Sequence, residues 1–575
     1  MKKRIGKFIL LLLVGALLSV LWGCSFRPAC AKTDDGKTLF RLGFSGAPDS
    51  LNPYDGVSEE AQAAFSLLFD RLFDVDIESG EIIPSLCTEY SFGQSATGAT
   101  LCKLTLRGDV FWHDGEKLTA SDVEFTLQSA KDYSALYGYP YCENLDTTGI
   151  AVEDDTHLSM IVWAGEEYVL QCLARIPILP RHFWNDLPSM HYNSSGVAAD
   201  PARARFDLLT LGQKSSSLIG SGPYVFSGME NGICSLRENE SYWREISGPE
   251  AVDLCFNVAD PVQAVLNSEI DACWNMSLSA WKQLTEENGI RTSVGSNGEM
   301  YCIGFNFAGN SPVQDRIVRQ AIDQCVNRQA ILLRAFGGGY AEAGLISPFS
   351  RWHQSNIPSD ERVYSPESAA LLLDGAGIVD RDGDGIRELN NGNPLRLDLI
   401  CLNGSAWETA AQILKSSCHQ AGIGIEVHPL TALAYNESMA SANYDIALSA
   451  RQNDPEPYHA LSAFYWDHGD NAISCPDANG HVSSRGWNES GYANEDYDIL
   501  YAAMMNAEGN ENISACGAEA ASALYEDAAY ISVGFSVRYQ AQTNVWYGSR
   551  TDRSSGLYFT PLTLAQQLRG INAAG

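Results

Sequence analysis

The stretch from Leu104 to Leu127 decides the fold: Leu-Thr-Leu-Arg-Gly-Asp-Val-Phe-Trp-His-Asp-Gly-Glu-Lys-Leu-Thr-Ala-Ser-Asp-Val-Glu-Phe-Thr-Leu. Apolar and polar residues alternate over Leu104–Arg107, which predicts a strand. A Gly-Asp pair and a His-Asp-Gly run follow as turn signals. Thr119 then begins a helix as its N-cap, and Asp122 three residues later completes a short-armed capping box. The stretch therefore predicts a strand, two turns and a capped helix.

The first residues form a targeting segment. Met1–Gly23 carries four cations near its start and continues as an apolar run over Phe8–Trp22. A run of that length suits a signal peptide and is too short for a typical membrane span. It ends in Leu-Trp-Gly-Cys, which is similar to a bacterial lipobox. We expect Cys24 to be lipidated and to anchor the chain outside the cell membrane or in the periplasm. The alternative is an ordinary signal peptide cleaved near Ala29–Ala31.

The chain is long and strongly acidic. Its 575 residues carry a formal charge of −33, and the length corresponds to three or four domains of about 150 residues each. This charge argues against nucleic acid or an anionic membrane surface as a partner, because both are negatively charged. It favours solubility and the attraction of cations or cationic solutes, although a solvated acidic face explains it equally well.

The cysteines do not form a recognisable framework. The chain has 15 cysteines, and those beyond Cys24 and Cys30 are odd in number and spread widely, without Cys-x-x-Cys pairs. Zinc ribbons and thioredoxin-like motifs are therefore not expected. Export allows disulfides, but many of these cysteines lie in apolar strand or helix contexts. We interpret most of them as small buried hydrophobic residues.

Alternating strands and helices indicate the fold class. A first strand over Leu39–Phe44 runs into a Gly/Pro-rich loop that contains Asn52. Further along, a strand over Leu395–Leu402 precedes a helix over Thr409–Ala421, and another strand over Tyr444–Leu448 follows. Strands that alternate with helices predict an α/β lobe with a parallel component.

The opening stretch also carries a resemblance. The pattern Leu-Arg-x-x-Val-x-Phe/Trp-x-Asp-Gly-x-x-Leu-Thr-Ala-x-Asp-Val resembles the signature of the family 5 solute-binding proteins, the oligopeptide-, dipeptide- and nickel-binding receptors of ABC importers. Gly220–Val225 is similar to the Gly-Thr-Gly-Pro-Tyr of that family. Arg237–Trp243 is similar to its Arg-Asn-x-x-Tyr-Trp, and Asp315–Ile331 to its Val-Arg-Gln-Ala-Ile helix. The resemblance covers essentially the whole mature chain, and in that family the opening stretch is scaffold and not ligand contact.

This resemblance implies an α/β, two-lobe, periplasmic-binding-protein-like fold (type II, cluster C-like) with an additional inserted domain. We expect a monomer that closes on a small-molecule or peptide ligand and presents it to ABC-transporter permease subunits. The expected ranges are a signal peptide at 1–23, a tether at 24–37, lobe I at 38–83, 206–262 and 506–575, an inserted domain at 84–205, and lobe II at 263–505.

Several ligand-binding candidates follow. The resemblance makes the loop around Asn52 reach the ligand cleft. The aromatic loop with Tyr137 and Tyr139 either forms a cleft wall or is held to the surface by its rings. Ligands of α/β lobes bind past the carboxyl ends of strands, which indicates the loop from Asn403 to Trp407. We expect Asn403, Ser405 and Trp407 to contact the ligand.

The second such loop departs from the family pattern. In the peptide-binding members this loop holds a Trp and then an Asp that pairs with the ammonium group of the peptide. Here the strand ends in Ala-Arg-Gln-Asn-Asp-Pro, where Arg451 falls at the Trp or at that Asp, depending on gap placement, and Asp454 matches a later acidic residue before Pro. Arg451 can pair with a ligand carboxylate or phosphate as a bidentate donor. The alternative is that Arg451 points to solvent or braces Asp454.

An acidic run resembles the beginning of a calcium loop. Asp380, Asp382 and Asp384 occupy positions one, three and five, Gly follows at six, and Glu388 at nine is the substitute for a bidentate Glu, because position twelve is Asn391. We expect these four carboxylates to form the metal candidate of the chain and expect no other cofactor. The alternative is an acidic turn without a metal.

Enzymatic signatures are missing from the sequence. It contains no Gly-x-Ser-x-Gly, His-Glu-x-x-His, Gly-x-Gly-x-x-Gly or Gly-x4-Gly-Lys-Ser/Thr motif. We therefore expect a binding protein that is not an enzyme and takes its transport energy from a partner. The alternatives are a surface receptor or chaperone-like binding protein without a transport role, and a secreted hydrolase. The sequence does not choose between a peptide, a sugar and a metal chelate as the ligand.

Overall fold

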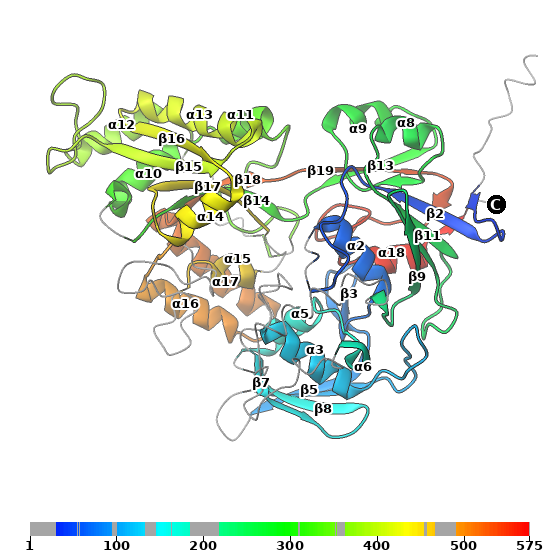
Figure 1. Ribbon diagram of the computed structural model, residues 1–575. Coiled ribbons are helices and arrows are strands. Elements are labelled where there is room, and N and C mark those ends of the chain that lie inside the picture. Colours follow the sequence, from blue (N-terminus) through cyan, green and yellow to red (C-terminus); the bar gives the residue numbers. More distant parts are fainter. Residues whose placement is uncertain are drawn as a thin grey trace, which may run out of the picture.

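The computed structural model has two lobes that are joined by strands running between them (Figure 1). The described residues are 30–54, 56, 58–94, 100–132, 145–162, 164–184, 218–308, 311–350, 352–353, 363–452, 457–465 and 490–573. Among these residues, no helix is both long enough and apolar enough to cross a bilayer.

Lobe I is built on an eight-stranded sheet in the order β13-β19-β12-β2-β11-β10-β9, with β1 paired to β2. Strand β2 runs parallel to β11 and β12, so that the carboxyl ends of three strands share one edge. The strands are β1 Ala31–Lys32, β2 Thr38–Gly43, β9 Tyr224–Glu230, β10 Ile233–Glu238, β11 Ala251–Cys255, β12 Ala272–Cys273, β13 Ile290–Gly295 and β19 Arg538–Thr543. The helices of this lobe are α2 Glu59–Leu68, α8 Pro261–Leu266, α9 Leu278–Thr285 and α18 Leu564–Gly570.

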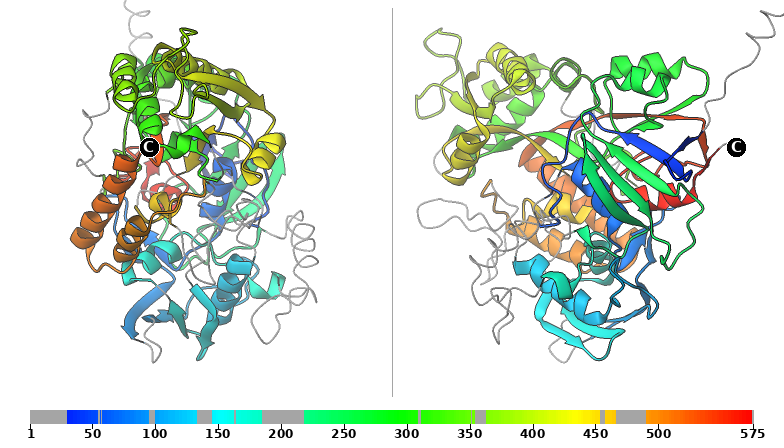
Figure 2. Two further views of the ribbon diagram at one scale, coloured as in Figure 1. Left: turned by 90° about the vertical axis from the view of Figure 1, so that its left-hand side faces the viewer. Right: turned by 45° about the vertical axis from the view of Figure 1, so that its right-hand side comes forward.

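The inserted domain is an antiparallel sheet in the order β5-β6-β8-β7, with helices packed beside it. Figure 2 shows it below lobe I. Its elements are β5 Cys87–Gln94, β6 Thr100–Leu106, α3 Ala120–Asp132, β7 Leu145–Val152, β8 His157–Val162, α5 Glu166–Leu173 and α6 Arg181–Trp184. The hairpin of β3 Phe73–Val75 and β4 Ile82–Pro84 leads into it from lobe I.

The opening stretch forms β6, the turns and α3, as the sequence predicts. The Thr119 N–H donates to Asp122 Oδ2 at 2.8 Å, which is the returning half of the capping box. His113 connects the stretch to lobe I. Its Nδ1 accepts from the Gly220 N–H, and its Nε2–H donates to the Gly222 carbonyl, both at 3.1 Å. Burial lowers the pKa of His113 to about 4, so the ring is neutral at pH 7.

Two of the family-like motifs meet in a stack of side chains. The Arg107 guanidinium lies 4.0 Å from the ring centroid of Trp243, and the Arg244 guanidinium lies 4.2 Å from the same ring. The Trp243 indole N–H donates to Asp70 Oδ2 at 3.1 Å. These contacts join the inserted domain to lobe I through cation–π and hydrogen-bonding interactions. The motif residues are thus scaffold, as the resemblance implies.

Lobe II is built on a five-stranded sheet in the order β16-β15-β17-β14-β18, in which β15, β16 and β17 are parallel. Helices α10–α13 cover one face, and α14–α17 pack on the other (Figures 1 and 2). The strands are β14 Glu299–Phe305, β15 Arg396–Leu402, β16 Gly424–Leu430, β17 Ile446–Gln452 and β18 Tyr530–Phe535. The helices are η4 Pro312–Gln314, α10 Arg316–Gln324, α11 Arg328–Ala335, α12 Pro366–Gly375, α13 Ser405–Gln420, α14 Ala432–Ala440, α15 Pro457–Ser462, α16 Glu495–Met505 and α17 Asn510–Asp527. The last strand pair, β20 Trp546–Tyr547 and β21 Asn572–Ala573, belongs to lobe I, where Trp546 packs on Phe40 of β2.

Strand pairing corrects the expected ranges of the lobes. The ranges expected from the sequence put β12 and β13 in lobe II and β18 in lobe I. In the structure β19 pairs with β12 and β13 in the first sheet, and β18 pairs with β14 in the second. The chain therefore crosses between the lobes at β13–β14 and at β18–β19. No composition change marks these crossings, because each is only a few residues long.

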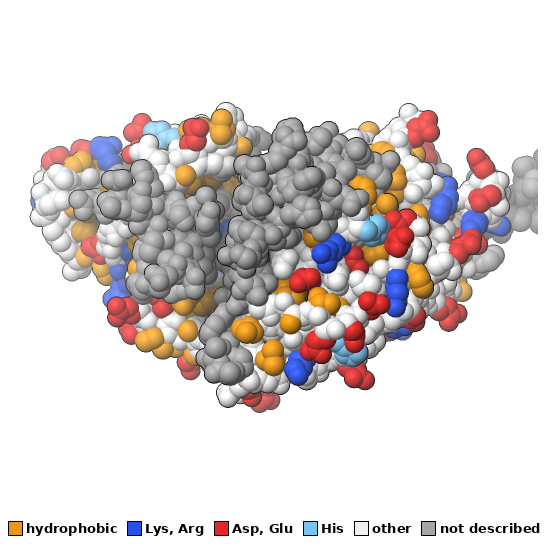
Figure 3. Space-filling view, turned by 60° about the horizontal axis from the view of Figure 1, so that its bottom comes forward, with side chains coloured by type: hydrophobic (Ala, Val, Ile, Leu, Met, Phe, Trp, Pro, Cys, Tyr) orange, Lys and Arg blue, Asp and Glu red, His pale blue; other side chains and the backbone are white. Residues whose placement is uncertain are grey.

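The surface and the cysteines agree with the sequence interpretation. Nine of the twelve described cysteines are buried. On the face shown in Figure 3, acidic and basic side chains are interspersed, and the described part of this face has no continuous basic patch. That pattern gives no support to nucleic-acid binding on this face.

Candidate functional site: a pocket between the lobes

The candidate site is a cavity of about 670 Å³ with walls from both lobes. Lobe I contributes residues that follow the parallel strands β2, β11 and β12: Ser45, 258–263, 275–280 and Gln283. Lobe II contributes Tyr301 of β14 and the residues after α11. The crossing segment at 537–539 lines it as well. The pocket thus lies at the carboxyl ends of parallel strands, where α/β folds bind ligands.

Aromatic rings form much of the lobe II wall. The Tyr301 and Phe336 rings stack with centroids 3.8 Å apart and planes 7° from parallel. The Trp407 ring meets Phe336 edge-on at 5.1 Å and Tyr301 at 6.1 Å. On the lobe I side, the Tyr539 ring packs on Trp281 at 5.3 Å. Burial raises the pKa of Tyr301 to about 12, so its hydroxyl remains protonated and can donate a hydrogen bond.

A charged cluster lies where the chain crosses between the lobes. Arg538 Nη2 lies 3.4 Å from Glu59 Oε1 and 3.2 Å from Glu299 Oε2. Glu59, in the first turn of α2, also accepts from the Trp274 indole N–H at 2.9 Å and from the Asn297 amide. Burial alone lowers the pKa of Arg538, but the two glutamates outweigh it and the pKa is raised. The guanidinium is therefore permanently charged and shared by two carboxylates.

Only one of the three candidate residues after β15 packs beside this pocket. Trp407 packs on the two rings that line it, whereas Asn403 and Ser405 are exposed at the beginning of α13. The Asn403 N–H donates to the Leu430 carbonyl at 2.7 Å. The structure thus places Trp407 at the aromatic wall and leaves the polar side chains of Asn403 and Ser405 at the rim of lobe II.

Arg451 lies on the other face of the lobe II sheet. In the β14–β17 register, Arg451 is opposite Met300, and Ala450 is opposite Tyr301. Successive residues of a strand point to opposite faces, so Arg451 shares a face with Met300 and not with Tyr301. Its guanidinium lies 5.9 Å from the Phe464 ring centroid. The structure therefore does not bring Trp407 and Arg451 together.

Asn52 is part of a turn. It is 3% exposed, and its Oδ1 accepts from the Tyr54 N–H at 3.0 Å. Its carbonyl accepts from the Gly56 N–H at 2.8 Å. The amide oxygen thus shapes the loop itself. Tyr137, Tyr139, Asp454 and Cys24 lie outside the described residues, and their predicted roles stay predictions.

The acidic loop is assembled as the spacing predicts. One carboxylate oxygen from each of Asp380, Asp382, Asp384 and Glu388 lies within 4.8 Å of the others. Asp380 accepts from two backbone N–H groups of the loop, at 2.7 and 3.0 Å, and the buried Glu388 accepts from the Arg381 N–H at 2.6 Å. Clustered carboxylates fit the oxygen ligands that Ca²⁺ takes. The loop belongs to lobe II alone and does not line the pocket between the lobes.

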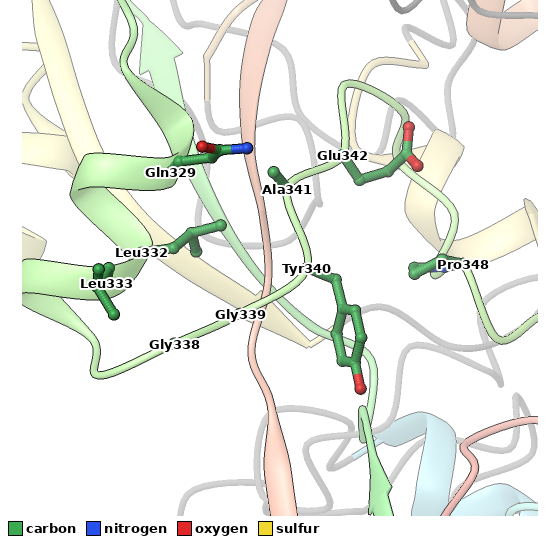
Figure 4. Close-up of a pocket in the computed structure, with 9 residues that line it drawn as sticks. All are labelled: Gln329, Leu332, Leu333, Gly338, Gly339, Tyr340, Ala341, Glu342 and Pro348. Carbon is green, nitrogen blue, oxygen red and sulfur yellow. The ribbon is translucent and has the colours of Figure 1, made fainter. Parts of the chain in front are cut away.

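A second cavity of about 440 Å³ also belongs to lobe II alone. Figure 4 shows Leu332 and Leu333 of α11 on one side and the segment with Tyr340 on the other. Tyr340 exchanges two backbone hydrogen bonds with Phe535, at 2.9 and 2.8 Å. All the residues that line this cavity fall between Gln329 and Pro348. Because lobe I contributes none of these lining residues, the shape of this cavity does not depend on the distance between the lobes.

Sequence reasoning missed the residues that give the pocket its character. Tyr301, Phe336, Glu59 and Arg538 lie far apart in the sequence and follow no motif. Only the fold brings them together. Strand β14 begins directly after one crossing between the lobes and β19 begins directly after the other, and the two crossings lie close enough for Arg538 to contact Glu299. The rule that ligands bind past strand ends would have found the residues after β2, β11 and β12 if those strands had been paired correctly.

Two α/β lobes, an inserted domain and a pocket that both lobes line define the class of two-lobe solute-binding proteins. The family model described as bacterial extracellular solute-binding proteins, family 5, matches residues 81–472, more than half of the chain. The chain belongs to this family.

Relatives with known names agree with that assignment. The chain is similar to the oligopeptide-binding protein AppA of Bacillus subtilis, at 23% identity over 464 residues, which cover 77% of this chain and 80% of AppA. The solved structure of that AppA with a nonapeptide has a TM-score of 0.67 and 19% identity, covering 93% of this chain and 99% of AppA. NikZ from Campylobacter jejuni with Ni(L-His) has a TM-score of 0.68 and 20% identity, covering 93% and 99%. The expected fold is therefore confirmed.

Proposed function

We propose that this protein captures a peptide-like solute between its lobes and delivers it to the permease of an ABC importer. The observation that carries the proposal is the pocket itself, because lobe I, lobe II and the crossing segment all line it. A solute held there contacts both lobes at once. AppA is described with a nonapeptide and NikZ with Ni(L-His), and these two ligands indicate the range of solutes to test.

Closure around the solute is the step that couples binding to delivery. A solute that touches both lobes favours the closed arrangement over the open one, and it shifts the population by the difference of its affinities for the two. The crossings at β13–β14 and β18–β19 are short, which suits a hinge between two rigid sheets. A permease that recognises the closed arrangement then receives only loaded protein.

The protein acts outside the cytoplasm, as its family does, and we propose that Cys24 carries the lipid anchor. We further propose that the protein works as a monomer and catalyses no reaction on its ligand. Replacement of Cys24 by Ala should release the protein from membranes and abolish labelling by a fatty-acid probe. Labelling that persists in Cys24→Ala would exclude this anchor.

We also propose that the loop from Asp380 to Glu388 binds Ca²⁺ as a structural ion. Its four carboxylates converge, and the loop connects α12 to β15, so an ion here would stabilise lobe II and would not touch the solute. The loop already satisfies several carboxylate oxygens with its own N–H groups, which supports a fold that persists without the ion.

The experiment that tests the main proposal is native mass spectrometry of protein expressed in its own host. A bound mass that is released on unfolding and sequenced as a peptide supports the proposal. Recovery of a non-peptide solute would contradict the proposed peptide ligand and would identify the true solute. Hydrolysis of added peptides by the pure protein would contradict the proposed absence of catalysis.

A further inference from the structure

Three side chains that can ligate a metal converge at the edge of the lobe II sheet. They are Asp398 of β15 and Glu426 and His428 of β16, the strand at one end of the sheet order. One donor atom from each side chain lies within 4.8 Å of the other two. None of the three lines the pocket between the lobes, and none belongs to the acidic loop from Asp380 to Glu388. The cluster is therefore separate from both of those sites.

The parallel register of β15 and β16 fixes this convergence. Asp398 is opposite Glu426, and His428 follows Glu426 by two residues. Residues two apart in a strand project from the same face, and so do residues that are opposite each other in neighbouring strands. All three side chains thus share one face. The cluster rests on two hydrogen-bonded strands, which hold side chains more rigidly than a loop does.

Asp398 is held in place by its backbone, which leaves its carboxylate for a ligand. Its N–H donates to Asp445 Oδ2 at 2.8 Å, and the Asp445 N–H donates back to the Asp398 carbonyl at 3.0 Å. The Asp398 carboxylate points the other way, with Oδ1 2.8 Å from His428 Nε2. The side chains of Asp398 and His428 are 61% and 40% exposed, so an ion can reach them from solvent.

The negative charges of the cluster are not balanced within it. His428 pairs with Asp398, whereas Glu426 makes no hydrogen bond or ion pair with any residue that the structure describes. Two carboxylates therefore lie side by side on neighbouring strands and repel each other. A divalent cation between the three donors would offset both carboxylates and would turn this repulsion into attraction.

One imidazole and two carboxylates indicate the kind of ion. Ca²⁺ and Mg²⁺ take oxygen ligands, whereas imidazole suits Zn²⁺, Ni²⁺ and Cu²⁺. Three protein ligands leave one position of a tetrahedral Zn²⁺ for water. Donor atoms about 2.1 Å from a single ion lie within roughly 4.2 Å of one another. Rotation of these exposed side chains reaches that spacing from the observed one.

We propose that Asp398, Glu426 and His428 bind a divalent transition-metal ion, and that this ion fastens the edge strand β16 to β15. The ion would stabilise lobe II without touching the solute, since the cluster does not line the pocket between the lobes. This site is independent of the proposed solute-binding function.

The test is isothermal titration of Zn²⁺ into tag-free mature protein that has been treated with a chelator. Glu426→Gln and His428→Gln should each weaken Zn²⁺ binding at least about tenfold, because each removes one of only three ligands. Glu426→Gln is the more informative variant, since Glu426 has no partner in the described part of the chain whose loss could disturb the fold. Zn²⁺ should also raise the melting temperature of wild type and not that of Glu426→Gln.

Two further variants control the result. His419→Gln removes an exposed imidazole from the last turn of α13, and Glu388→Gln alters the acidic loop. Both should bind Zn²⁺ as tightly as wild type. Equal affinity in wild type, Glu426→Gln and His428→Gln, or no binding to wild type, would overturn the proposal. A loss in His428→Gln that Glu426→Gln does not share would likewise contradict a site with three ligands.

Discussion

His113 should make the fold sensitive to acid, because this ring holds the opening stretch against lobe I only in its neutral form. Its Nδ1 accepts from the Gly220 N–H, and protonation of that nitrogen would abolish the bond. Burial lowers the pKa of His113 to about 4 in the folded protein, against about 6.5 in an unfolded chain. The depressed pKa means that the stability contribution is complete above pH 6.5 and is lost as the pH falls towards 4.

The size of the effect follows from the two pKa values. Each tenfold difference in proton affinity corresponds to about 1.4 kcal/mol, so His113 accounts for at most about 3 kcal/mol between pH 7 and pH 4. Asp70 acts in the opposite sense, because burial raises its pKa to about 6, and protonation below that pH favours the folded state. The wild-type profile alone therefore mixes the two groups.

A variant separates them. His113→Gln retains an acceptor and a donor but has no proton to gain in this range. The free energy of unfolding of both proteins should be measured by urea titration at pH 7, 6, 5 and 4.5, followed by circular dichroism. The stability difference between wild type and variant should shrink by about 2 to 3 kcal/mol as the pH falls. Parallel profiles would show that His113 does not titrate as described.

The other predictions concern the scaffold, the ligand loops and the acidic loop. Gly220→Ala should destabilise the protein by more than about 3 kcal/mol in thermal unfolding, because the added Cβ would clash with the Leu68 carbonyl. A melting temperature within about 2 °C of that of wild type would contradict this close approach. Trp407→Ala should weaken binding of the co-purified solute about tenfold, as its ring braces Tyr301, and unchanged affinity in titration would remove it from the site. Arg451→Ala should leave the affinity for a solute with a free carboxylate within about twofold of wild type, because its side chain lies on the face of the sheet away from Tyr301, and a tenfold loss in titration would show that Arg451 reaches the solute. Millimolar Ca²⁺ should raise the melting temperature by a few degrees in wild type and not in Glu388→Gln, and equal shifts in both would exclude the acidic loop as the cause.

The local structure was largely readable from the sequence because it rests on short-range physics. The capped helix after Thr119 and the acidic turns after Asp380 depend on residues within a few positions of one another, and both form as predicted. Most of the described cysteines are buried for the same reason, since they lie in apolar segments.

Long-range pairing was not readable in the same way. The expected boundaries placed β12 and β13 in the wrong lobe because β19, about 250 residues later, selects them as partners. The pocket depends on that pairing, since Arg538 begins β19 and meets Glu59 only after the sheet has formed. Side chains alternate between the two faces of the sheet along β17, and this alternation puts Arg451 and Trp407 on different faces. The sequence alone could not show this, because it does not give the register of β17 against β14.

The central claim is that a solute held between the lobes draws them together. Small-angle X-ray scattering of the mature protein, with and without the solute released from it, tests this directly. We predict a smaller radius of gyration in the loaded protein, by on the order of 1 Å, because the hinge crossings let two rigid lobes approach. Identical scattering curves at saturating solute would contradict the account.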